Sequence, residues 1–128
     1  MIRYAFPVIL LFFLAACGAK KHVAATHANG NPEVVVFMKG KGTEAVKVME
    51  KVYYENGKLE YVGRFEDGVE HGEWIYYYED GSKKFVENWE AGLEHGIHYD
   101  YMPDGQVRRE LHYDHGKLIK TIDKMDTP

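Results

Sequence analysis

Two short segments of this 128-residue sequence place glutamate, histidine and glycine side by side. They read FEDGVEHGEW at residues 65–74 and WEAGLEHGIH at residues 89–98. Imidazole and carboxylate groups are common ligands of zinc and common general acids and bases in enzymes. The motif therefore indicates a metal site, an acid/base pair, or one turn that occurs twice.

The spacing of the histidines argues against a metal site. His71 and His95 occupy equivalent places in the two segments, and equivalent places in successive β-hairpins lie about 9–10 Å apart. A zinc site needs three or four ligands at about 2.0–2.1 Å from the ion. His95 and His98 are closer in sequence, but no motif supplies a third ligand. We predict exposed turn histidines, no metal and no cofactor.

The carboxylates give no sign of catalysis. Glu66, Glu90 and Asp114 recur at one position of a repeat, so all three are expected to have the same surroundings. A catalytic pair needs two carboxyl groups whose surroundings separate their pKa values. The sequence also contains no nucleophile elbow, phosphate-binding loop or Cys/His pair. We predict that the protein is not an enzyme.

A period of 24 residues explains why the motif occurs twice. Two sets of glycines follow it, namely Gly57, Gly81 and Gly105, and Gly68, Gly92 and Gly116. The runs between these turns are too short for helices and are rich in Tyr, Val, Phe and Trp, as in β-strands. The sequence predicts an all-β fold, an open-edged antiparallel meander of about three 24-residue hairpins. Approximate repeat bounds are 50–72, 73–96 and 97–119.

Alternation along the second strand of each hairpin predicts a sheet with one apolar and one wet face. Phe85 and Trp89, for example, alternate with Lys84 and Asn88, while Arg109 is an exception on the apolar face. In the first strands we expect Ile75 and three equivalent tyrosines in the core, and we expect His98 and Asp100 on the wet face. The three tyrosines are Tyr53, Tyr77 and Tyr101.

This assignment leaves a surplus of apolar and aromatic side chains on the face expected to be wet. The surplus consists of Val52, Tyr54, Trp74, Tyr76 and Tyr78. Tyr and Trp offer large contact area at low entropic cost, so these residues are the candidate binding surface. Two alternatives are that the N-terminal strand or sheet curvature covers them, or that they form cross-strand ladders.

The first 16 residues have the pattern of an export signal. Arg3 is followed by an apolar run that is too short to span a bilayer, which needs about 20 residues. The end of this run, Leu14-Ala15-Ala16-Cys17, resembles a bacterial lipobox, which implies that Cys17 is acylated and begins the mature chain. The alternative is an ordinary cleaved signal with a stray thiol.

Residues 17–32 show no periodicity, and we predict that they form the acylated residue and a flexible tether. The predicted location is the cell envelope, and the outer membrane in a diderm organism, because Gly18 rather than Asp follows the cysteine. The folded domain is expected over residues 33–122, followed by a polar tail at 123–128. Within it we expect strands at 33–40, 44–54 and 118–122, where 44–54 has a helix entering a strand as its alternative.

The mature chain carries 15 Lys and Arg against 20 Asp and Glu, because Arg3 is lost with the signal, and its net charge is therefore −5. This balance argues against nucleic acid as a partner, since phosphates require a basic surface.

Paired aromatics, an Asx-Gly turn, an aromatic–acid pair and a second glycine turn, as in YYYEDG and NWEAGLEHG, resemble the MORN-repeat variant of bacteria. The resemblance covers residues 50–119 and implies hairpins laid side by side in an elongated, twisted sheet. The third unit departs from the pattern, with His98 in place of the usual Trp and Lys120 in place of the closing Gly. That departure indicates a capping repeat.

The variant is found in bacterial lipoproteins and in proteins named as antitoxin-like. We therefore expect a membrane-anchored lipoprotein that binds an envelope protein, or acts as a scaffold, through its sheet. The alternative is an immunity or antitoxin-like protein, since a basic toxin would complement the −5 charge. A purely structural spacer would have no partner. The open edges also allow an edge-strand homodimer.

Overall fold

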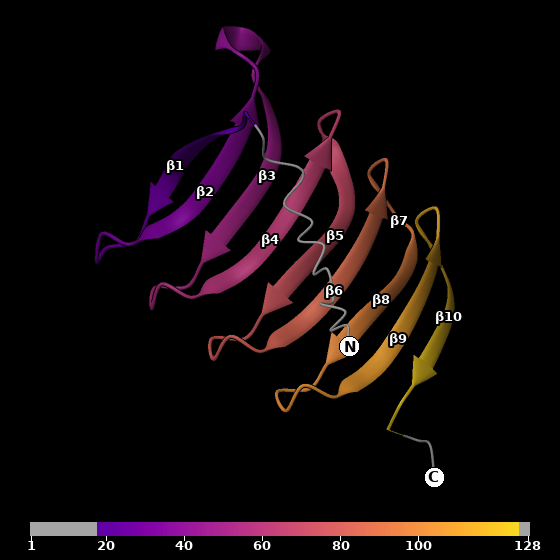
Figure 1. The fold of residues 1–128 in the computed structure, drawn as a ribbon. Helices are drawn as coiled ribbons and strands as arrows, with labels where there is room; N and C mark the ends of the chain where they lie inside the picture. Colours follow the sequence, from indigo (N-terminus) through magenta and orange to yellow (C-terminus); the bar gives the residue numbers. More distant parts are fainter. Residues whose placement is uncertain (1–17, 126–128) are drawn as a thin grey trace, which may run out of the picture.

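The computed structural model describes residues 18–125, which form one antiparallel sheet in a single layer (Figure 1). Its strands are β1 (Lys20–Thr26), β2 (Pro32–Lys39), β3 (Val46–Tyr53), β4 (Leu59–Glu66), β5 (Val69–Tyr77), β6 (Lys83–Glu90), β7 (Leu93–Glu94), β8 (Gly96–Tyr101), β9 (Val107–Asp114) and β10 (Lys117–Asp123). Strand order follows the chain, with β7 pairing only with β6. The predicted all-β meander with open edges is confirmed.

Helical structure is almost absent from the described part of the chain. The 3-10 turn η1 (Gly42–Glu44) interrupts the connection from β2 to β3. Within residues 18–125 no helix has the length and apolar character needed to cross a membrane. The strand prediction for residues 44–54 is correct over Val46–Tyr53, and the helix alternative for that segment is wrong.

Two kinds of turn alternate along the sheet. At one end, Gly57 donates its N–H to the carbonyl of Tyr54 (2.9 Å), and the Asn56 side chain accepts the N–H of Lys58 (2.9 Å). At the other end, two-residue turns need a positive φ at both positions. Asp67 and Gly68, for example, have φ values of 51° and 81°. The repeat therefore alternates a longer Asx-Gly turn with a tight two-residue turn.

The prediction of a flexible tether is wrong for most of residues 17–32, because β1 and β2 form another hairpin of the same design. His27 donates its N–H to Asn31 (2.8 Å), and Gly30 donates to His27 (2.9 Å). The Asn29 side chain accepts the Asn31 N–H (2.9 Å), which matches the bonds around Gly57. Cys17 lies outside the described residues.

The irregular spacing of this hairpin explains why the 24-residue period does not reveal it. Gly30 precedes Gly57 by 27 residues rather than 24. Residues 40–45, which include η1, form a six-residue connection where the later hairpins have a two-residue turn. The longer connection shifts the glycines out of register without changing the hairpin.

The predicted division into one apolar and one wet face is also wrong. Tyr76 lies opposite Tyr61 and Phe85, so it shares a face with the aromatic residues of the second strands. Ile75 lies opposite Val62 and Val86 on the other face. Both faces carry apolar side chains because the described strands form one layer, and each face must be covered by side chains of its own strands.

Two names describe these surfaces below. The aromatic face consists of Tyr61, Phe65, Trp74, Tyr76, Phe85, Trp89 and His98. The valine row on the opposite face consists of Val23, Val35, Val62, Ile75 and Val86. Val35, Trp74 and Val86 are the buried apolar residues of the described chain, at 1%, 8% and 4% exposure.

A glycine makes room for the largest buried side chain. Gly63 lies in β4 beneath the indole of Trp74, and a Cβ at position 63 would overlap three ring atoms of Trp74. The indole Nε1 donates to the carbonyl of Arg64 (3.1 Å), which fixes the ring over the strand. Trp74 therefore depends on the missing side chain of its neighbour.

We expect Gly63→Ala to lower the free energy of unfolding by about 1–3 kcal/mol, because the added methyl group must displace the indole. Urea unfolding followed by tryptophan fluorescence measures this change. Lys83→Ala, at an exposed position, is the control and should change the stability by less than about 0.5 kcal/mol. A Gly63→Ala protein as stable as the control would show that the indole does not rest on this glycine.

Candidate functional site

The aromatic face is a cross-strand ladder centred on Trp74. Its ring stacks on Tyr61 (6.0 Å between centroids) and meets Phe65 edge-on (5.2 Å) and Trp89 at a tilt (6.4 Å). Tyr61 also contacts Tyr76 (5.4 Å). Such pairs stabilise neighbouring strands beyond their burial of area. The ladder, which the sequence left open as an alternative, therefore spans the paired strands β4, β5 and β6.

Two carboxylates lie within this face and accept hydrogen bonds from its rings. Glu50 accepts from the Tyr61 hydroxyl (2.6 Å), and Glu87 accepts from the Tyr76 hydroxyl (3.3 Å) and Trp89 Nε1 (2.9 Å). Burial and the neighbouring carboxylates raise the pKa of Tyr61 and of Tyr76. Both phenols act as donors in these hydrogen bonds.

Each of the five predicted binding residues has a structural role in the sheet. Trp74 is buried, and Tyr76 belongs to the ladder. Val52 is half-buried between Val34 and Tyr61. The expectation of an apolar surplus on a wet face is therefore wrong, whereas the role of these residues in binding stays a prediction.

Tyr54 and Tyr78, the other two, join successive hairpins. The Tyr54 hydroxyl donates to the carbonyl of Tyr77 (2.6 Å), and the Tyr78 hydroxyl donates to that of Tyr101 (3.0 Å). His27 lies in the matching place of the first hairpin, with Nε2 at 2.7 Å from the Tyr53 carbonyl. The same bond between hairpins therefore recurs three times.

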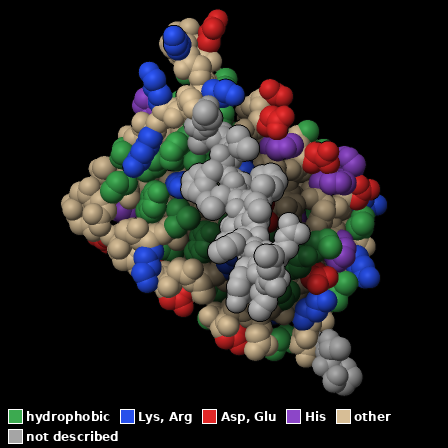
Figure 2. Space-filling model, in the orientation of Figure 1, with side chains coloured by type: hydrophobic (Ala, Val, Ile, Leu, Met, Phe, Trp, Pro, Cys, Tyr) green, Lys and Arg blue, Asp and Glu red, His purple; other side chains and the backbone are tan. Residues whose placement is uncertain are grey.

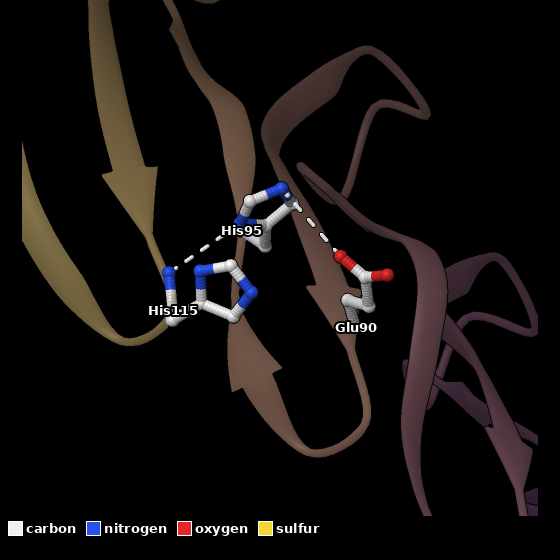
Figure 3. Close-up of side chains that lie close together, drawn as sticks. All are labelled: Glu90, His95 and His115. Atoms are coloured by element: carbon white, nitrogen blue, oxygen red, sulfur yellow. Dashed lines mark hydrogen bonds and ion pairs between the residues drawn. The ribbon is translucent and has the colours of Figure 1, made fainter.

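At the two-residue turns, the structure brings together Glu90, His95 and His115 (Figure 3). His95 Nε2 lies 3.5 Å from a Glu90 oxygen, and His95 Nδ1 accepts the backbone N–H of His115 (3.4 Å). One ligand atom of each residue lies within 4.8 Å of those of the other two. His95 and His115 occupy different positions of adjacent hairpins. A comparison restricted to equivalent positions of the repeat therefore does not predict this cluster.

The comparisons with known proteins bear on the repeats. A family model described as MORN repeat variant matches residues 49–67, 70–91 and 94–115. The chain carries three MORN repeats. A comparison with curated proteins gives no match.

Among solved structures, the chain is similar to the "Glycosylation Associate Protein (Gap123) complex from Streptococcus agalactiae". Identity is 15% and the TM-score is 0.47. The match covers 79% of this chain and 18% of that chain, so this protein spans less than a fifth of its structural neighbour's length.

In the third MORN repeat, His98 replaces the tryptophan of the second repeat. His98 Nε2 lies 3.0 Å from the carbonyl of Asn88, which is the repeat equivalent of the bond from Trp74 to Arg64. His98 is 1% exposed and stacks on Tyr113 (4.4 Å). The prediction of a wet, turn-like His98 is wrong, because its ring fills a tryptophan site.

Asp100, also expected on the wet face, is 6% exposed and holds two arginines. Its Oδ2 accepts from Arg108 Nη2 (2.6 Å) and Arg109 Nη2 (2.8 Å). Burial by itself would raise the pKa of Asp100, but the hydrogen bonds from Arg109 and Arg108 outweigh it and hold the pKa below its usual range. Arg109, the exception on the apolar face, is thus neutralised by its cross-strand neighbour.

We expect Asp100→Asn to lower the free energy of unfolding at pH 7 by about 1–3 kcal/mol, because the charge that holds both arginines is lost. The pKa of Asp100 is lower in the folded than in the unfolded chain, so its contribution is present above the unfolded-state pKa and is lost as the pH drops through the folded-state pKa. Urea unfolding at pH 7 and at pH 2.5 should show the difference between wild type and variant shrinking in acid. Glu79→Gln, in an exposed turn, is the control; an equal difference at both pH values would contradict this assignment.

Proposed function

We propose that this MORN-repeat protein is a lipid-anchored envelope module that binds another protein through its sheet and catalyses no reaction. The observation that carries the proposal is the aromatic face of a one-layer sheet, over which no other element of residues 18–125 packs. Hydrophobic side chains are visible across one face of the molecule (Figure 2). Half-buried rings on a rigid sheet offer contact area that loses little entropy on binding.

The distribution of charge supports the anchoring part of the proposal. Residues 18–58 contain seven lysines and four glutamates, a net charge of +3. Residues 59–125 contain eight Lys and Arg against 15 Asp and Glu, a net charge of −7. Since β1 begins three residues after Cys17, an acyl chain there would hold the basic end of the sheet at the membrane. Anionic phospholipids attract such lysines and reinforce a single lipid anchor.

We expect Cys17→Ser to move the protein from the membrane fraction to the soluble fraction and to abolish labelling by a fatty-acid analogue. Cell fractionation with immunoblotting measures the first effect. Circular dichroism of the released protein checks that its sheet is intact. A Cys17→Ser protein that stays in the membrane fraction would refute the lipid anchor.

Neighbouring residues on opposite faces give a matched test of the binding face. Val52 and Phe85 lie on the face that carries the ladder, and Lys51 and Arg64 lie with Val62 on the other face. We expect Val52→Gln with Phe85→Gln to remove crosslinks to envelope proteins in intact cells. Lys51→Gln with Arg64→Gln should leave those crosslinks unchanged. Both variants are checked for folding, and equal crosslinking by the two would exclude the aromatic face as the binding surface.

A second candidate is an immunity or antitoxin-like protein. The −7 charge of residues 59–125 favours it, because a basic toxin would be attracted to that part of the sheet. The export signal would confine such a toxin to the envelope. Deletion of the gene should then cause toxicity that re-expression relieves, and growth unaffected by deletion in every condition would count against this function.

Pairing with a second copy is open to β1 and β10, the strands at the sheet edges. Lysines occupy both of them, namely Lys20, Lys21, Lys117 and Lys120. Lysines on an edge resist pairing with another edge of like charge. We therefore place the partner on the face of the sheet and not at its edges.

A further inference from the structure

The two-residue turns repeat one arrangement of acid and histidine. An acid at the end of one strand is followed five residues later by a histidine beyond the turn, which lies in β5 for His71 and between β7 and β8 for His95. Glu66 with His71 and Glu90 with His95 have this spacing, at N···O distances of 3.2 Å and 3.5 Å. Figure 2 shows histidine and acidic side chains gathered along one end of the molecule. The two acid–histidine pairs have similar spacing and distance. They differ in the residues of the neighbouring turn.

The turn beside each histidine docks in the same way. Gly92 donates its N–H to the carbonyl of Glu70 (2.9 Å), and Gly116 donates to that of Glu94 (2.8 Å). The residue before each glycine therefore lies beside the histidine. It is Ala91 next to His71, and it is His115 next to His95. The sheet thus holds one cluster with two imidazoles and one with a single imidazole.

We propose that Glu90, His95 and His115 form a surface site for a divalent transition metal ion such as Zn²⁺. The ligand atoms lie within 4.8 Å of one another. Two donors on one zinc lie at most about 4 Å apart, since each is about 2.0–2.2 Å from the ion. The side chains of Glu90 and His115 are 58% and 66% exposed, so rotation about their own bonds closes this gap.

Asp114 supplies the outer contact that metal-binding imidazoles need. Its Oδ1 lies 2.6 Å from His115 Nδ1 and 3.6 Å from His95 Nδ1. The Asp114 carboxylate holds the proton on His115 Nδ1 and leaves Nε2 of that ring for the ion. Two imidazoles and one carboxylate suit Zn²⁺, Ni²⁺ and Cu²⁺ better than Mg²⁺ or Ca²⁺. These three protein ligands leave at least one coordination position of the ion open for water or for a ligand group of a partner.

Isothermal titration calorimetry with Zn²⁺ tests the site on the mature chain carrying Cys17→Ser and no affinity tag. Replacement of the cysteine removes the one thiol of the sequence. We expect one ion per chain and a zinc-dependent rise in melting temperature, because binding to the folded state alone stabilises it. Zinc that binds no chain, or that leaves the melting temperature unchanged, would overturn the proposal.

Variants within the repeat provide the controls. His115→Ala places at position 115 the residue type of the equivalent position 91. The variant is expected to fold, since Ala91 adopts a φ of 50° in its own turn. It should weaken Zn²⁺ binding at least tenfold, and Asp114→Asn should weaken it about tenfold. His71→Ala should leave binding unchanged. A His71→Ala effect as large as that of His115→Ala would show diffuse surface binding and refute the site.

The matching turn also allows a gain of function. Ala91→His in the His115→Ala protein places a second imidazole beside His71 and Glu66, with Glu90 behind it. We expect this double variant to recover Zn²⁺ binding by at least tenfold over His115→Ala alone. No recovery would contradict the three-ligand geometry. Anchoring and the binding face play no part in these measurements, so their outcome is independent of the proposed function.

Discussion

The described strands form one layer, so each face of the sheet must be covered by side chains of its own strands. This constraint determines which residues occupy the two faces. The indole of Trp74 spreads over Gly63 and contacts three other aromatic rings. On the opposite face, β-branched side chains such as Val62 and Val86 flank Ile75. The polar groups within these surfaces are satisfied by neighbours in the same sheet, as Glu50 is by Tyr61. Packing is therefore lateral, from strand to strand.

Lateral packing also explains why the repeats tolerate substitution at one position and not at another. His98 can replace a tryptophan because its ring nitrogen meets the equivalent backbone carbonyl, that of Asn88, and its ring stacks on Tyr113 of the next strand. At the turns, Asp67, Ala91 and His115 all adopt a positive φ, and their side chains are free to differ. Chemistry can consequently vary at the turns while the ladder is preserved. The cluster around His115 arises from that freedom.

The sequence predicted what depends on local conformation and missed what depends on contact between strands. Glycine spacing gave the hairpins, because the turns require a positive φ that glycine adopts readily. The faces of the first strands were misassigned because alternation alone does not say that Tyr76 pairs with Tyr61 and Phe85. The sequence does not reveal strand β1, because an irregular connection hides its period. His115 was missed because equivalent positions never meet, whereas different positions of adjacent hairpins do.

The side-chain hydrogen bond from each hairpin to the next, such as that from Tyr54 to Tyr77, has a consequence for cooperativity. Every such bond reaches only the adjacent unit, so the stability of the array is close to a sum of unit and interface terms. Unfolding should then begin by fraying at β1 or β10 and travel inward. The six-residue connection after β2 shows that one unit can take an insertion while its neighbours keep their register. An array of this kind can change in length, one hairpin at a time, without a new fold.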